Sequence, residues 1–129
     1  MATFSYFDMS GNEDSPTEPE RFYHGFVLGL IADQADRYEI SSNRESGFGR
    51  YDVMLIPRKQ GDRRYPAIIM EFKVYNEKKE KSLEETVQHA LDQIEEQNYD
   101  AQLYARGFTK EEIRHYGFAF EGKKVLIGE

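Results

Sequence analysis

The sequence predicts an α/β domain in which helices flank a mixed β-sheet. Apolar residues recur at helical spacing in residues 20–35 and 82–99, and the runs between and after these segments have the composition of strands. The resulting order is a helix, three strands, a helix, short helical turns and two strands, which is typical of a sheet with parallel and antiparallel neighbours. The chain has 129 residues, enough for one such domain.

The first segment with helical spacing is preceded by a polar stretch. Residues 9–19 combine Ser, Gly, Asn, Asp and two prolines with a single apolar residue. We therefore expect residues 1–19 to form a disordered arm or linker and residues 20–129 to form the domain. Pro19 lies just before the first helix, predicted over residues 20–35, as a residue that favours helix starts.

Three strands are predicted next, and a second helix follows them. The strands are YEISS (38–42), RYDVMLIP (50–57) and a run that contains AIIMEFKV (67–74), separated by a turn over 43–49 and by the polar loop RKQGDRR. The second helix is the clearest element because Ser82 and Glu85 have the spacing of a capping box and a stripe of apolar residues follows.

The C-terminal part is expected to contain short helical segments and a hairpin. A helical turn should extend from Tyr99 and stop at Gly107, and Thr109 should begin another short turn. The remaining residues alternate between polar and apolar, and Glu121-Gly122 has the composition of a hairpin turn.

AIIMEFKV contains two charged residues, Glu71 and Lys73, in a strand that otherwise reads as buried. A turn centred between Gly61 and Asp62 would place Asp52 of the preceding strand directly opposite Glu71. Since strand side chains alternate, Lys73 would share the face of Glu71. This register predicts a polar pocket that contains Asp52, Glu71 and Lys73.

Such a pocket has a chemical use. Two carboxylates can hold Mg²⁺, which takes its other ligands from water and a substrate phosphate, and an adjacent ammonium can orient the attacking water. The pattern therefore suggests metal-assisted hydrolysis of a phosphodiester. The alternative is an edge strand whose Glu71 and Lys73 face solvent, because an acid two residues before a lysine is a common pattern.

Five segments also carry a family resemblance: FYHGFVLGL, SNRESGFGRYDVML, AIIMEFKV, ALDQIEEQNY and YGFAFEGKKV. Together with Asp52 and Glu71-Phe72-Lys73, they resemble the PD-(D/E)XK nuclease superfamily, and more narrowly the nuclease-like domain found C-terminal in bacterial AAA-ATPase-like proteins. The resemblance runs from about Arg21 to Ile127. It implies a restriction-endonuclease-like αβββαβ core and a DNA-hydrolysing enzyme that uses Mg²⁺, with Mn²⁺ as a substitute.

The resemblance also implies roles for particular residues. Asp52 and Glu71 would bind the metal, Lys73 would assist the nucleophilic water, and Gln93 of the second helix would contact that water or the substrate. Related nucleases place a tyrosine four residues after this glutamine, where this chain has Gln97, so Tyr99 is assigned no role. Additional candidates, each with a plain structural alternative, are Glu20, His24, Glu45 and Arg50.

Composition limits the class of protein. There is no cysteine, which excludes disulfides and thiolate metal sites, and no apolar run is long enough to span a membrane or act as a signal peptide. We expect a cytoplasmic protein. Its net charge is −7, and the first 20 residues hold five acids and no Lys or Arg. Since this acidity disfavours general DNA binding, the alternative function is a catalytically silent module for interaction or regulation.

The sequence also suggests partners. DNA is the expected substrate, recognised by its shape or backbone, because no segment resembles a sequence-reading module. No Gly-rich phosphate loop with Lys-Ser or Lys-Thr occurs in the chain, so any ATPase domain would lie in another part of a longer protein. A homodimer would suit a duplex or branched substrate.

Overall fold

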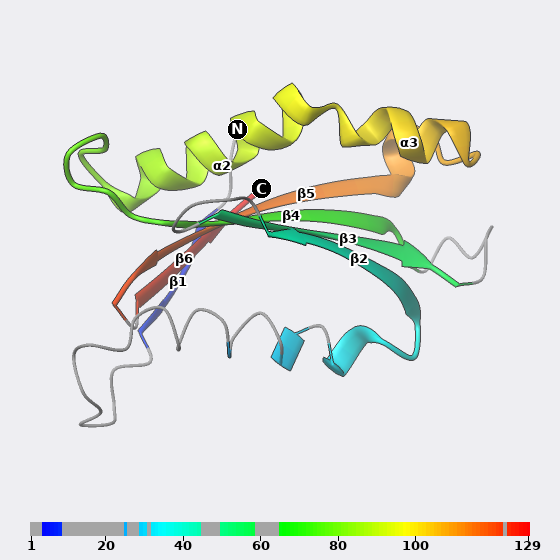
Figure 1. Ribbon diagram of the computed structural model, residues 1–129, viewed down its shortest axis with the longest axis horizontal. Helices are drawn as coiled ribbons and strands as arrows, with labels where there is room; N and C mark the ends of the chain where they lie inside the picture. The colour runs from blue at the N-terminus through cyan, green and yellow to red at the C-terminus, as the bar shows by residue number, and fades with distance from the viewer. Residues whose placement is uncertain are drawn as a thin grey trace.

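The computed structural model describes residues 4–8, 25, 29–30, 32–44, 50–58, 65–122 and 124–129. Within these residues the chain forms a six-stranded sheet in the order β1-β6-β5-β4-β3-β2 (Figure 1). The strands are β1 (Phe4–Asp8), β2 (Tyr38–Arg44), β3 (Arg50–Pro57), β4 (Ala67–Val74), β5 (Ile113–Glu121) and β6 (Lys124–Gly128). The helices are α2 (Leu83–Gln97), α3 (Tyr99–Ala105) and the 3-10 helix η1 (Lys110–Glu112).

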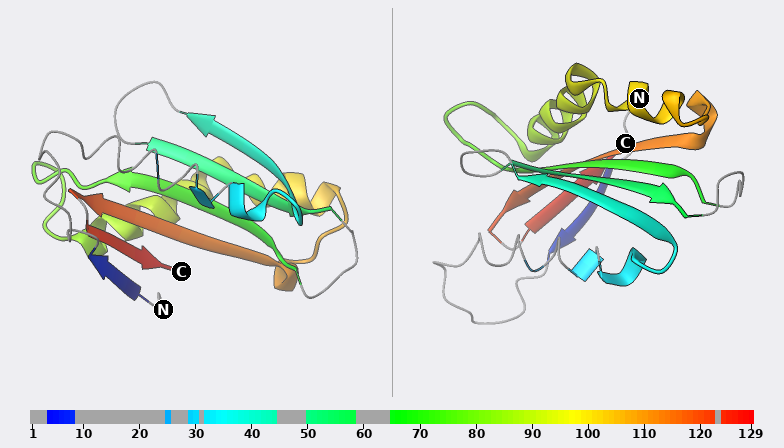
Figure 2. Two further views of the ribbon diagram at one scale, coloured as in Figure 1. Left: turned by 90° about the horizontal axis from the view of Figure 1, so that it is seen from below. Right: turned by 45° about the vertical axis from the view of Figure 1, so that its right-hand side comes forward.

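The sheet is mixed, as the sequence predicted. β4 and β5 are parallel, and the segment that connects them contains α2, α3 and η1. The other neighbouring strands pair antiparallel. Figure 2 shows the resulting order from the cyan end of β2 to the blue strand β1 beside the red strand β6.

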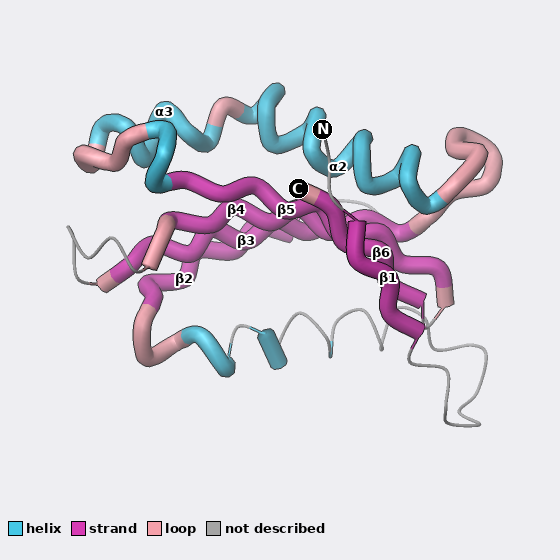
Figure 3. The backbone as a smooth tube through the Cα atoms, turned by 180° about the vertical axis from the view of Figure 1, so that it is seen from behind, coloured by secondary structure: helices cyan, strands magenta, loops and turns pink. Residues whose placement is uncertain are grey.

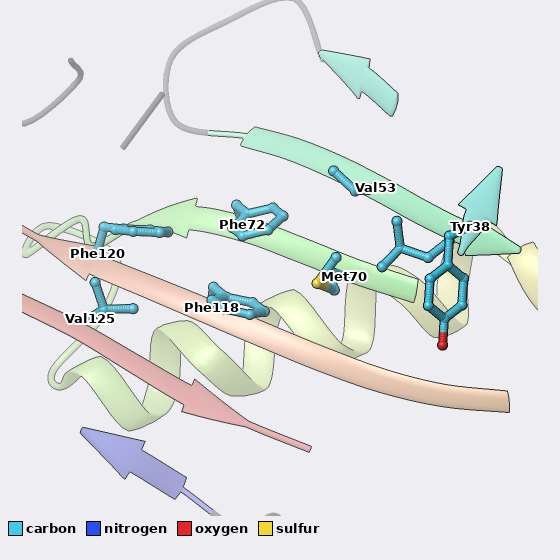
Figure 4. Packing of buried hydrophobic residues seen from close by; sticks show 8 residues of the cluster. Tyr38, Val53, Met70, Phe72, Phe118, Phe120 and Val125 are labelled. Atoms are coloured by element: carbon cyan, nitrogen blue, oxygen red, sulfur yellow. The ribbon is translucent and has the colours of Figure 1, made fainter. Parts of the chain in front are cut away.

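Helices lie on both faces of the sheet. α2 and α3 cover one face (Figures 1 and 3), and the helical residues 29–30 and 32–34 lie on the opposite one. On that opposite face Leu30 packs against a core rich in aromatic side chains, in which the Phe72 and Phe118 rings lie 4.5 Å apart between centroids (Figure 4). None of the helices in the described part is both long and apolar enough to cross a membrane.

The face under α2 and α3 has its own apolar core. Met54 and Ile69 of the sheet pack with Ile94 of α2 and Leu103 of α3. Even-numbered positions of β3 and odd-numbered positions of β4 therefore face these two helices, since strand side chains alternate. Asp52, Glu71 and Lys73 belong to these positions.

The first five described residues differ from the predicted arm. Phe4–Asp8 forms β1, which pairs antiparallel with β6 and extends the sheet by one strand. The main-chain groups of β6 provide the hydrogen bonds that order such an edge strand, and this pairing depends on a segment far away in the sequence. Residues 9–19 of the predicted arm lie outside the described part, and the domain boundary at residue 20 stays a prediction.

α2 lies directly on β5 at Gly117. A Cβ atom at this position would be 2.8 Å from the main-chain oxygen of Val87 and 3.2 Å from the Ala90 Cβ. Gly117 is also the β5 partner of Glu71 in the parallel pair. The absence of a side chain here therefore sets the height of α2 above the polar pocket.

We expect Gly117→Ala to lower the free energy of unfolding by about 1–3 kcal/mol, the usual cost of overpacking against atoms that cannot move aside. Urea denaturation measures this change. Gly29→Ala is the matched control. Gly29 is helical, and in the described part nothing beyond its chain neighbours and its own helix backbone lies within 4 Å of an added Cβ, so alanine should leave stability unchanged or raise it. Equal losses in the two variants would contradict the packing argument.

Candidate active site

Asp52 and Glu71 lie directly opposite each other on neighbouring antiparallel strands. The register of β3 and β4 pairs these two residues, which confirms the pairing predicted from the turn. Their Cβ atoms are therefore about 4.5–5.5 Å apart. Asp52 is 5% exposed and Glu71 is 0% exposed. The strand pair thus holds two buried carboxyl groups side by side, which excludes the alternative of an edge strand with a solvent-facing Glu71.

Two neighbouring buried carboxylates repel each other and lose hydration, so such a pair needs positive charge or hydrogen-bond donors nearby. Lys73 is two residues after Glu71, on the same face of β4, and is half-buried. The loop that leaves β4 leads to α2, which runs back over this face. The predicted trio of Asp52, Glu71 and Lys73 therefore lies on one face, beneath a helix.

Tyr99 is a donor to this pair that the sequence did not identify. Its hydroxyl donates a hydrogen bond of 2.7 Å to Asp52 Oδ2. α2 ends at Gln97, its C-cap Asn98 has a left-handed φ of 53°, and α3 starts at Tyr99. Asparagine tolerates this conformation better than most residues. The break between the two helices thus changes the direction of the chain and brings Tyr99 over Asp52. In the sequence, Asn98 is the residue that indicates this break.

Glu80 is a second residue of this region that the sequence did not identify. It lies in the loop between β4 and α2 and is 5% exposed. Its carboxyl group accepts hydrogen bonds from the Asn76 main-chain N–H at 2.9 Å and the Thr86 hydroxyl at 2.9 Å, and its Oε2 is 2.7 Å from His89 Nδ1.

The surroundings of Glu80 act on its pKa in opposite directions. Burial raises the pKa of this carboxyl group, while the hydrogen bonds from Asn76, His89 and Thr86 and the positive charge of Lys73 together lower it below its ordinary value. Glu80 is therefore an ionised group at neutral pH, close enough to Lys73 to interact with its charge.

Gln93 lies on the half of α2 that leads to Tyr99. It is half-buried, and Ile94 beside it is buried against the sheet. By helical spacing it shares a flank with His89, one turn earlier. The contact of Gln93 with the metal-bound water or the substrate stays a prediction.

A sequence comparison identifies the family. Residues 18–129 match the profile of the PD-(D/E)XK nuclease superfamily. The chain belongs to this superfamily. A search of curated proteins and a search of solved structures each returned no match.

The fold and the residue pattern agree with PD-(D/E)XK membership. The mixed sheet with helices on both faces is restriction-endonuclease-like, as expected from the sequence. Asp52 and Glu71-Phe72-Lys73 have the residue types and the order of the acids and the lysine after which the superfamily is named, and their roles stay predictions.

The described part of the structure does not include the side chains of the other candidate site residues. Glu20, His24 and Glu45 lie outside the described residues. For Arg50 only the main chain is described, and it pairs with the main chain of Lys73 across β3 and β4. The roles suggested for these four residues therefore stay predictions.

PD-(D/E)XK nucleases generally use divalent metals, and the donor chemistry here fits one. Within the described part no group of three or more acidic or histidine side chains is gathered to hold a metal ion. Mg²⁺ does not require one, because it keeps several waters and commonly binds through one or two carboxylates together with substrate phosphates. A cavity of about 40 Å³ lies beside Asp52 and Tyr99, which is room for water next to the Asp52 carboxylate.

Proposed function

We propose that this chain is a divalent-metal-dependent nuclease domain that hydrolyses phosphodiester bonds of DNA. The observation that carries the proposal is the buried, directly opposed pair Asp52 and Glu71, with Lys73 on the same face. A protein gains no stability from two adjacent buried acids, so their placement needs a chemical reason. Superfamily membership supports a nucleic acid as the substrate.

In this proposal Asp52 and Glu71 hold Mg²⁺, or Mn²⁺ in its place. When bound, the metal supplies Lewis-acid stabilisation of charge on the phosphate and makes a coordinated water more acidic. The Tyr99 hydroxyl keeps Asp52 in a fixed rotamer through its 2.7 Å hydrogen bond, which reduces the entropy lost when the carboxylate takes up a ligand.

The other roles belong to side chains that do not hold the metal. The Lys73 ammonium has three N–H donors with which to orient the attacking water and stabilise the charge that develops on the phosphate. Gln93, on the helix above, contributes an amide that can donate to the same phosphate or accept from the same water. We propose further, from the sequence resemblance, that the domain acts in the cytoplasm beside an ATPase domain of the same protein and that a homodimer engages duplex or branched DNA.

The test is a screen of the purified chain against linear, nicked, single-stranded and branched DNA with Mg²⁺ or Mn²⁺, with EDTA as the control. We expect cleavage of at least one substrate with metal and none with EDTA. Thermal unfolding in parallel should show a metal-induced rise in Tm of about 4 °C when the ion is at ten times its Kd, because a ligand of the folded state stabilises it. Absence of both cleavage and the Tm rise would favour the silent interaction module instead.

A further inference from the structure

Glu80, Thr86 and His89 form a polar cluster, called here the Glu80 cluster, beside the carboxylate pair. Glu80 is almost fully buried, whereas the His89 side chain is 39% exposed. The cluster therefore has a fixed interior end at Glu80 and an accessible end at the imidazole. Three hydrogen-bonding partners of the Glu80 carboxyl group, counted within the described part, hold the interior end in place.

The cluster adjoins the proposed reaction site. Lys73 interacts electrostatically with Glu80, so its ammonium lies within the range of the charge of the cluster. Gly117, the strand partner of Glu71, would meet Val87 and Ala90 of α2 if it carried a Cβ, so the helix crosses the sheet beside Glu71 at the level of the turn that contains His89. His89 is thus on the helical turn that crosses the sheet beside Glu71, one turn before Gln93.

The contact with Glu80 fixes the chemical state of the imidazole ring. An ionised carboxylate only accepts hydrogen bonds, so Nδ1 of His89, 2.7 Å from Oε2, must be the donor. Nε2 is then the nitrogen that serves another partner. In the imidazolium ion Nε2 is also a donor.

We propose that His89 is a phosphate-binding residue of the nuclease site and that Glu80 is its positioning residue. The ligand is a non-bridging oxygen of the nucleic-acid backbone, held by Nε2–H of the imidazolium while Nδ1–H stays on Glu80. This inference rests on the proposed function and deepens it, because it names a contact that holds the substrate rather than the metal.

The proposed substrate, DNA, is a polyanion, so its binding depends on the charges around the pocket. Asp52, Glu71 and Glu80 are three buried acidic side chains in this region, and they would repel a DNA backbone. A histidine paired with the buried Glu80 adds a positive charge at the accessible edge of the pocket. Charge-assisted hydrogen bonds to phosphate are about twice as strong as neutral ones, so one well-oriented contact has a measurable effect on affinity.

The first test measures binding of a duplex oligonucleotide by fluorescence anisotropy, with EDTA present so that no cleavage occurs. His89→Gln removes the imidazolium but keeps a polar side chain, and we expect its Kd to rise about 5- to 10-fold. The slope of log K against log salt should fall by the amount that corresponds to about one phosphate contact. Unchanged affinity and slope would overturn the inference.

His115→Gln is the matched control. His115 also has a carboxylate partner, with Nε2 2.7 Å from Asp100 Oδ1, and it lies close to Glu95. By helical spacing Glu95 projects from the flank of α2 opposite to Gln93. The control therefore removes a histidine–acid pair of similar geometry on the other flank of α2, and its DNA affinity should equal that of the unaltered chain. An equal loss of affinity in both variants would overturn the specific role of His89.

The second test uses Glu80→Gln, for which general electrostatics and the inference predict opposite results. Removal of an acid should strengthen binding to a polyanion if only net charge matters. If Glu80 holds the His89 ring through a charge-assisted hydrogen bond, the Kd of Glu80→Gln should instead rise about threefold or more. Glu84→Gln, which removes an exposed acid of α2, should leave Kd unchanged or lower it. Tighter binding by Glu80→Gln would overturn the positioning role. If this variant does not fold, His89→Gln still decides the matter.

These measurements separate this inference from the proposed function. If the chain cleaves DNA with Mg²⁺ but His89→Gln binds normally, the phosphate contact is wrong and the nuclease proposal stands. If binding depends on His89 and Glu80 as described while no metal supports cleavage, the contact stands and the nuclease proposal fails.

Discussion

Asp52→Asn should lower metal-dependent cleavage of DNA at least about a thousandfold, which corresponds to about 4 kcal/mol of lost transition-state stabilisation. The amide is nearly isosteric with the carboxylate and keeps an oxygen that can accept from the Tyr99 hydroxyl. The change therefore removes the charged metal ligand with little change in packing. Single-turnover cleavage of the substrate found in the screen measures the effect.

The same variant should be more stable than the unaltered chain when no metal is present. Two unit charges about 5 Å apart repel by roughly 3 kcal/mol at an effective dielectric constant of 20, and Lys73 offsets part of this. We expect a gain of about 1–3 kcal/mol in urea denaturation with EDTA, together with loss of the metal-induced Tm rise.

Asp92→Asn, an exposed acid on α2, is the control and should change neither property. An Asp52→Asn variant that is destabilised and still responds to metal would show that the pair is structural. A gain in stability at the expense of activity is the pattern expected where a functional site stores unfavourable charge.

The carboxylate pair could be predicted from the sequence because its determinants are local. The register of β3 and β4 depends on the centre of the loop between them, and the face of each side chain follows from the alternation of strands. Asp52 and Glu71 each interrupt an apolar run, so their partnership could be inferred without knowledge of the rest of the molecule.

Tyr99 and Glu80 could not be predicted in this way because their places depend on long-range packing. Tyr99 contacts Asp52, 47 positions earlier in the chain, because α2 ends at Gln97. Had α2 continued, Tyr99 would occupy a different angle around the helix axis. Glu80 lies in a polar segment, NEKKEKS, that reads as an exposed loop. It is buried because the Asn76 amide, Thr86 and His89 surround its carboxyl group.

The strand β1 illustrates a related limit. Its sequence, FSYFD, is short and precedes a polar segment, and its partner β6 is near the other end of the chain. Nothing local distinguishes such a segment from an apolar arm, since the pairing is decided by which sheet edge is available.

Lys73→Ala should lower cleavage by a factor of about 10²–10⁴ while the protein still binds metal, because a positioned group that orients the water or stabilises charge contributes about this much. The metal-induced Tm rise should stay equal or increase, since the substitution removes a positive charge beside the two carboxylates that hold the ion. Single-turnover cleavage and thermal unfolding with Mg²⁺ measure the two effects on the same sample.

Two further variants sharpen this prediction. Lys78→Ala removes an exposed lysine of the loop after β4 and should leave both properties unchanged. Lys73→Arg keeps the charge but replaces a compact ammonium by a planar guanidinium, so it should recover only part of the lost rate. If Lys73→Ala cleaves normally, the lysine has no part in the reaction. If it loses the response to metal together with cleavage, its role is to maintain the carboxylate pair, because an ammonium that serves only the reaction is not needed for the ion to bind.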